Sequence, residues 1–98
     1  MPQSHAISAK VFCLNHNIDY HFIEELHELG LIEIQEEPEA VLIPEEQLPA
    51  LEKMVRLHVD LDINVEGIET ISYLLQRIEN MQHEIMELRN RVDFYKHF

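Results

Sequence analysis

Apolar residues recur at helical spacing near the start of the chain. After a loose end at residues 1–5, Ile7 begins a helical pattern in which Ser8 is a suitable N-cap. Phe12 and either Cys13 or Leu14 fall on one side of this helix, so we expect them to be buried. The polar segment at residues 15–17 then ends the helix.

A second helical pattern follows within a few residues. Asp19 is a suitable N-cap, and Gly30 is a typical C′ residue in a left-handed conformation. The apolar residues between them keep helical spacing and are expected to face inward: Phe22, Ile23, Leu26 and Leu29. A helix, a short turn and a second helix are the outline of a helix-turn-helix.

The middle of the chain predicts a β-hairpin. Segments 31–35 and 40–43 are short and rich in β-branched and other apolar residues, and the polar segment 36–39 joins them. A hairpin next to a helix-turn-helix is a wing. The pattern therefore predicts a winged helix-turn-helix.

A third helix is predicted after the wing. Pro44 is followed by Glu45 and Glu46, which are favourable near a helix N-terminus, and Pro49 falls in the first turn, where its missing N–H costs little. The apolar positions that continue this helix are Leu48, Leu51, Met54, Val55, Leu57 or His58, and Leu61.

The last third of the chain predicts one long helix with a heptad pattern. Residues 62–64 are a boundary, Asn64 is a suitable N-cap, and the helix would run to Lys96, about 50 Å at 1.5 Å per residue. Two series with a spacing of seven form the a and d positions: Ile71, Ile78, Ile85 and Val92, and Leu74, Met81, Leu88 and Tyr95. We expect residues 1–62 to form the winged helix-turn-helix and residues 63–98 a coiled-coil segment that makes a homodimer. The alternative is a long helix packed only within its own chain.

Charge changes the interpretation of this scaffold. The 98 residues have a formal charge of −12, and between Lys10 and Lys53 there are eleven Asp or Glu and no Lys or Arg. Duplex affinity comes largely from cations that neutralise phosphates, so this surface should repel nucleic acid and anionic membranes and attract a basic protein. No apolar run is long enough to span a membrane, and the single Cys13 suits a reducing compartment, so we expect a cytoplasmic protein.

Candidate chemistry is sparse. Cys13, His16, His21 and His27 have spacings that match no usual zinc arrangement, so we expect no metal site and interpret Cys13 as a small buried hydrophobe. Gly30 and Gly67 are the only glycines, which excludes a glycine-rich phosphate loop. We expect no cofactor and no catalytic residues, and hence a protein that is not an enzyme.

Two acidic clusters are candidates for partner binding. The second helix presents Glu24, Glu25 and Glu28, together with its cap Asp19, and the junction of the last two helices carries Asp60, Asp62 and Glu66. Each cluster is either a solvated acidic face or a docking surface for a basic helix.

Residues across most of the chain resemble the MerR-type winged-helix proteins and, within them, the CbpM-type chaperone modulators. The resemblance is carried by the order and spacing of three segments: 12–18, 29–33 and 55–68, which includes Gly67-Ile68. The long Leu-, Ile-, Glu- and Arg-rich helix that follows matches as well. No single motif among them is diagnostic.

The sequence departs from the DNA-binding branch of that family at the positions that would read DNA. When Gly30 and Leu31 are aligned, Glu24, Glu25 and Leu26 stand where those proteins carry an Arg-Tyr-Tyr-like segment. The return strand of the wing, 40–43, lacks their arginine. The resemblance therefore argues against operator binding.

The resemblance implies a function and a partner. CbpM-type proteins bind and inhibit the J-domain of a DnaJ-like, CbpA-type co-chaperone, so we expect a regulatory protein that occludes the Hsp70-binding surface of a J-domain. The alternatives are a MerR-like transcriptional regulator with lost or weakened DNA binding and a homodimeric adaptor. MerR-type relatives dimerise through antiparallel helices. In this chain Arg77 facing Glu84 favours that direction, whereas Glu84 with Arg89 favours a parallel pair.

Overall fold

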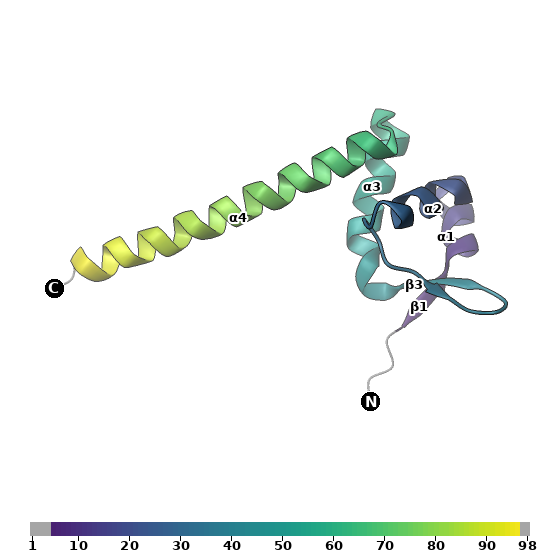
Figure 1. The fold of residues 1–98 in the computed structure, drawn as a ribbon, viewed down its shortest axis with the longest axis horizontal. Coiled ribbons are helices and arrows are strands. Elements are labelled where there is room, and N and C mark those ends of the chain that lie inside the picture. Colours follow the sequence, from purple (N-terminus) through teal and green to yellow (C-terminus); the bar gives the residue numbers. More distant parts are fainter. Residues whose placement is uncertain (1–4, 97–98) are drawn as a thin grey trace.

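A computed structural model describes residues 5–96 (Figure 1). The elements in chain order are β1 (Ala6–Ser8), α1 (Ala9–His16), α2 (Tyr20–Glu28), β2 (Gln35–Glu36), β3 (Val41–Pro44), a 3₁₀ helix η1 (Glu45–Gln47), α3 (Leu48–Leu61) and α4 (Val65–Lys96). The mainly α, winged helix-turn-helix fold with a long C-terminal helix is confirmed. Of the expected loose end, residues 1–4 lie outside the described residues.

The N-caps predicted for the first two helices are confirmed. The Ser8 hydroxyl accepts a hydrogen bond from the Val11 N–H at 3.4 Å, and the Asp19 carboxylate accepts one from the His21 N–H at 3.1 Å. Asn17 ends α1 with φ 54°, a left-handed conformation that asparagine tolerates better than most residues. Gly30 has φ +75°, as expected for a C′ residue.

The sheet differs from the predicted hairpin. It has three antiparallel strands in the order β1-β3-β2, so Ile7 lies in a strand opposite Ile43 and does not begin a helix. The first strand of the wing is also shorter than segment 31–35, because Ile32 turns into the core and only Gln35 and Glu36 pair with β3. Pairing between residues about 36 positions apart leaves no local pattern, and for that reason the short β1 strand could not be predicted.

One hydrophobic core joins all the helices. Its largest fully buried side chains come from α1, α2, β3, α3 and α4: Phe12, Ile23, Leu26, Ile43, Leu51 and Ile68. Cys13 is buried as expected. The prediction that Leu29 faces inward is wrong: Leu29 is 37 % exposed, because α2 ends at Glu28 and Leu29 is its C-cap. Leu61, which continues α3 as predicted, is 64 % exposed in its last turn. Leu14, the alternative to Cys13, is exposed.

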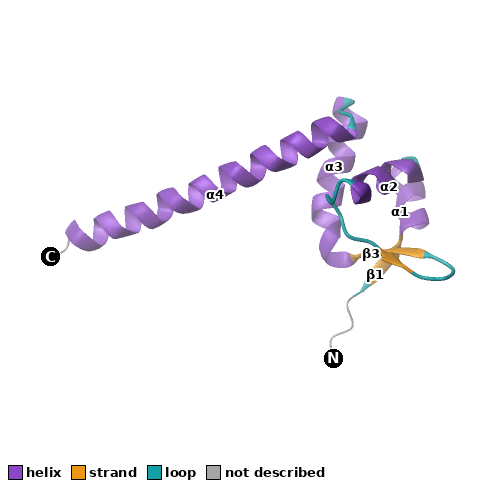
Figure 2. Cartoon of the chain, viewed as in Figure 1, coloured by secondary structure: helices purple, strands orange, loops and turns teal. Residues whose placement is uncertain are grey.

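The junction between α3 and α4 is a tight turn. Pro49 lies in the first turn of α3, as predicted. Asp62 ends α3 with φ 55°, and the Asn64 side-chain oxygen accepts a hydrogen bond from the Gly67 N–H at 2.8 Å, which makes Asn64 the N-cap of α4. From this turn α4 leaves the rest of the molecule (Figure 2).

α4 belongs to the core only at its start. Val65 and Ile68 are buried, whereas every residue from Tyr73 to Lys96 is exposed. Figure 1 shows the helix extending away from the other elements, and the long dimension of the molecule is 63 Å. Residues 5–64 are called the head below.

Candidate functional site

The outward side of α2 carries carboxylates. Glu24 and Glu28 are exposed and Glu25 is half-buried, while Phe22, Ile23 and Leu26 on the opposite side are buried. We call Glu24, Glu25 and Glu28 the acidic α2 face. In a winged helix-turn-helix this second helix has the position from which DNA-binding relatives contact a groove of the duplex.

A groove lies beside the acidic α2 face, between α2, the end of α3 and the start of α4. Its volume is about 260 Å³. Its lining residues are Asp19, His21, Phe22, Glu25, His58, Asn64, Val65 and Glu66. The groove brings together carboxylates from both acidic clusters, which are far apart in the sequence. Asp60 and Asp62 are exposed at the α3–α4 junction and do not line it.

An aromatic pair forms part of the groove wall. The rings of Phe22 and His58 are stacked, with centroids 4.4 Å apart and an interplanar angle of 17°. His58 Nδ1 lies 2.9 Å from the Ile63 carbonyl oxygen. A carbonyl can only accept a hydrogen bond, so Nδ1 carries the proton and the ring is fixed between α2 and the α3–α4 turn. The pair gives the groove an apolar surface between its carboxylates.

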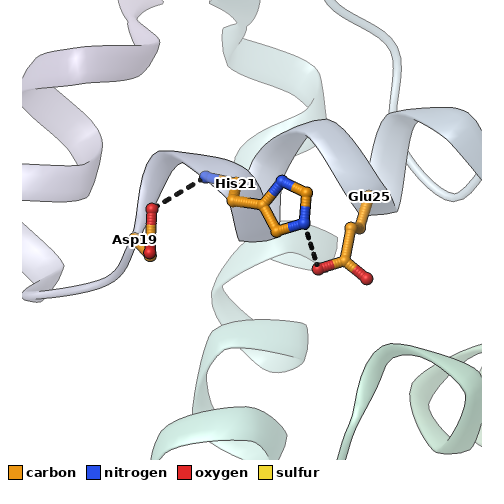
Figure 3. Close-up of polar contacts among 3 residues, drawn as sticks. All are labelled: Asp19, His21 and Glu25. Atoms are coloured by element: carbon orange, nitrogen blue, oxygen red, sulfur yellow. Dashed lines mark hydrogen bonds and ion pairs between the residues drawn. The ribbon is translucent and has the colours of Figure 1, made fainter.

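The polar contacts at the rim are drawn in Figure 3. His21 Nε2 lies 3.2 Å from Glu25 Oε1, one helical turn further along, and the Asp19 carboxylate caps the helix at the His21 N–H (Figure 3). The His21 side chain is 71 % exposed, and such a pair contributes little to stability. The ion pair uses only the Oε1 atom of Glu25, so the Oε2 atom of the same carboxylate does not contact His21. No Lys or Arg is among the lining residues.

The surface around the wing is also acidic. Glu36, Glu37 and Glu39 are exposed at its end, where the Glu37 N–H donates a hydrogen bond to the Ala40 carbonyl at 2.8 Å. The three cations of the head, Lys10, Lys53 and Arg56, are exposed on α1 and α3, away from the wing and α2 in sequence. The two elements that contact DNA in a winged helix-turn-helix are therefore both negative.

Two side chains of the helix-turn-helix have raised pKa values. Burial, and then the negative charge of Asp19, raises the pKa of the Cys13 thiol, which favours the thiol over the reactive thiolate. Burial, followed by the charge of Glu24, likewise raises the pKa of the Tyr20 hydroxyl. Within residues 5–96, His, Cys, Asp and Glu side chains form no group of three that would hold a metal ion. No helix in this part of the chain is long and apolar enough to cross a membrane.

The heptad positions of α4 form an exposed apolar stripe. Seven of the eight side chains are between 45 % and 74 % exposed, and Ile71, nearest the head, is half-buried. At the C-terminal end the stripe continues through Ile85, Leu88 and Val92, which are flanked by Arg89, Asp93 and Lys96. Large exposed apolar surfaces of this kind mark interaction sites.

Comparison with known proteins agrees with this architecture. Residues 7–90 match the family described as "MerR HTH family regulatory protein". The chain belongs to the MerR HTH regulatory family. A comparison with curated proteins found no match.

Sequence reasoning missed part of the groove in this MerR-family protein. It placed Glu25 and Glu66 in separate clusters, and it assigned His58 only as an alternative apolar position of α3. The ring stack with Phe22 joins residues 36 positions apart, so no local spacing indicates it. The stacked Phe22–His58 pair in its wall distinguishes this groove from an ordinary solvated acidic face.

Proposed function

We propose that this MerR-family protein is a regulatory protein that binds the J-domain of a DnaJ-like, CbpA-type co-chaperone and blocks the surface through which the J-domain contacts Hsp70. The observation that carries the proposal is the acidic α2 face, which lies in a segment of 42 residues without Lys or Arg, beside a concave groove that has no Lys or Arg among its lining residues. The partner class comes from the resemblance to CbpM-type modulators, and the charge supplies the mechanism.

The expected mode of binding is a basic helix of the J-domain lying along α2. Carboxylates on Glu24 and Glu28 would attract the basic helix, and a Lys or Arg side chain would enter the groove between Glu25 and Glu66. Its aliphatic stem would pack against the groove wall beside the Phe22–His58 pair while its charge meets the rim. Attraction between opposite charges accelerates association, and it weakens as salt screens the charges.

A second candidate function is a transcriptional regulator that has lost or weakened direct DNA binding. The family membership and the winged helix-turn-helix favour it. The negative charge of α2 and of the wing opposes duplex contact, so such a regulator would need a second protein to reach DNA.

We also propose a homodimer formed through α4. The apolar stripe would be covered by the same stripe of a second copy, in the knobs-into-holes manner of a coiled coil. The dimerisation residues are the eight heptad positions of α4 that begin at Ile71 and end at Tyr95. Replacement of Ile85 and Leu88 by Asp is expected to give a monomer, measured by light scattering; an unchanged dimer mass would contradict this interface.

Charge reversal tests the J-domain proposal. Binding of an isolated J-domain is measured by calorimetry with the wild type and with Glu24→Lys/Glu25→Lys/Glu28→Lys. We expect the triple variant to bind more weakly by about 2 kcal/mol or more, roughly thirtyfold in Kd, because attraction becomes like-charge contact. Thermal stability should change little, since two of the three side chains are exposed and the third is half-buried.

The matched control changes the net charge equally at other exposed positions. Glu37→Lys/Glu39→Lys/Glu52→Lys alters two wing residues and one on α3. An equal loss in both triple variants would mean that only the overall charge matters. If the wild type binds the J-domain and neither variant binds it more weakly, the J-domain contacts another face, such as that of Asp60, Asp62 and Glu66.

A further inference from the structure

Two histidines line the groove beside the acidic α2 face, and they use different partners. His21 Nε2 lies 3.2 Å from Glu25 Oε1, and its ring points toward that carboxylate (Figure 3). His58 instead donates from Nδ1 to the Ile63 carbonyl at 2.9 Å and stacks on Phe22. Within residues 5–96, the ion pair at the groove is therefore the one that His21 makes.

We propose that His21 makes binding at this groove depend on pH. When His21 is charged, it occupies Glu25 with a cation of the chain itself and repels a basic side chain of the partner. When His21 is neutral, the whole charge of Glu25 is available to that side chain. The proposal rests on the proposed J-domain function and adds its regulation: affinity falls as the pH is lowered below neutrality.

The charged and titratable groups that surround His21 come from three helices. The start of α2 contributes Asp19 and Glu25, α3 contributes His58, and α4 contributes Glu66. No Lys or Arg lines the groove, and α1, which also packs against α2, contributes no lining residue. With its three carboxylates ionised, the groove has a formal charge of −3 when both imidazoles are neutral and −1 when both are protonated.

The charge of His21 decides how much of Glu25 a partner meets. A neutral imidazole can still donate a hydrogen bond from Nε2 to Glu25, but the carboxylate keeps its whole negative charge. A protonated imidazole donates the same hydrogen bond and places a positive charge 3.2 Å from Oε1. Imidazoles change charge between about pH 5 and 8, a range in which ordinary carboxylates stay ionised, so the histidines dominate this change.

Binding of a cation and protonation of His21 oppose each other. A Lys or Arg side chain that enters beside Glu25 disfavours the charged form of His21, because like charges repel. The coupling is reciprocal, so a partner that binds better to the deprotonated groove must release protons when it binds at a pH where His21 is partly charged. Proton release is a signature that a purely structural role of His21 would not produce.

The exposed part of α4 contains a matched control for the His21 pair. His83 Nε2 also lies 3.2 Å from a carboxylate oxygen one helical turn further along, that of Glu87. The side chains of His21 and His83 are similarly exposed, at 71 % and 74 %. His83 lines no part of the groove and is not among the heptad positions of α4. A difference between the two histidines therefore reports their surroundings.

Calorimetry with an isolated J-domain tests the proposal. Kd is measured at about pH 8 and about pH 6, at constant ionic strength, for the wild type, His21→Gln and His83→Gln. Acidification should raise Kd about threefold more in the wild type and in His83→Gln than in His21→Gln, since an exposed charge pair has a modest effect. Titration of the J-domain itself is common to all three proteins and cancels in this comparison.

Proton release is measured in the same titrations. At about pH 6.5 the heat of binding is compared in buffers with different enthalpies of ionisation. The wild type and His83→Gln should release more protons per J-domain bound than His21→Gln does. Equal pH dependence and equal proton release in the wild type and His21→Gln would overturn the proposal. An equal effect of His21→Gln and His83→Gln would also overturn it, because the groove would then play no part.

A second variant fixes the charge instead of removing it. His21→Lys carries a cation at both pH values, so it should bind about threefold more weakly than the wild type at about pH 8 and lose the same part of the pH dependence. Wild-type affinity of His21→Lys at about pH 8 would contradict the proposal. Absence of J-domain binding to the wild type at that pH would overturn the proposed function as well, whereas binding with unchanged pH dependence in both variants would overturn only the role of His21.

Discussion

His58 stacks on Phe22 with 4.4 Å between the ring centroids, and this contact joins α3 to α2. The same imidazole donates from Nδ1 to the Ile63 carbonyl at 2.9 Å. One side chain therefore fixes three features of the groove: the position of α2, the end of α3 and the turn that starts α4.

Replacement of this imidazole is expected to loosen the head. His58→Ala removes the ring stack and leaves the Ile63 carbonyl without its donor, so the free energy of unfolding should fall by about 1–3 kcal/mol. Urea denaturation measures the change. His83→Ala, which removes an exposed histidine of α4, is the control and should shift stability by no more than about 0.5 kcal/mol. Equal effects of the two substitutions would contradict a structural role for the stack.

Local signals predicted much of the fold. Ser8, Asp19 and Asn64 are N-caps whose side chains accept hydrogen bonds from N–H groups two or three residues further along. Gly30 follows the end of α2 because glycine, which has no Cβ, adopts a positive φ without strain. These features depend on near neighbours in the sequence, and sequence reasoning found all four.

Contacts between distant segments could not be predicted in the same way. β1 forms only because Ile7 meets Ile43, and the groove exists only because α4 begins beside α2. The acidic residues themselves were predicted from the sequence, whereas their meeting around the Phe22 ring depends on how α2, α3 and α4 pack.

Gly30 provides a second test of local structure. Its φ of +75° is strained for any residue with a Cβ, while open space surrounds the position. Gly30→Ala should therefore destabilise the head by about 1 kcal/mol through backbone strain alone. Gly30→Asn should cost less, since asparagine tolerates this conformation. Identical melting temperatures for wild type and Gly30→Ala would contradict the assignment.

Cys13 should react slowly with alkylating reagents. Burial and the nearby charge of Asp19 raise the pKa of its thiol, so less thiolate is present in the folded protein than in the unfolded chain at the same pH. We expect alkylation at pH 8 to be at least about tenfold slower in buffer than in guanidinium chloride. Because the folded thiol has the higher pKa, its contribution to the free energy of unfolding is fully present below pH 9. That contribution falls above pH 9, where the thiol of the unfolded chain ionises first. Equal alkylation rates would show that Cys13 is accessible.

Duplex DNA should not bind with useful affinity. Both α2 and the wing present carboxylates to the surface that would face phosphates, and low salt strengthens that repulsion. A gel shift against mixed genomic fragments at low salt measures this. A saturable shift at micromolar concentration or below would favour the transcriptional alternative.

We propose that the acidic α2 face and its groove bind a J-domain. Titration of the isolated J-domain of the cognate DnaJ-like co-chaperone into this protein at low salt, followed by calorimetry, tests it most directly. We expect saturable binding with one J-domain per chain, and an affinity that falls as salt is raised. The absence of saturable binding at low salt, with both proteins folded, would contradict the proposed function.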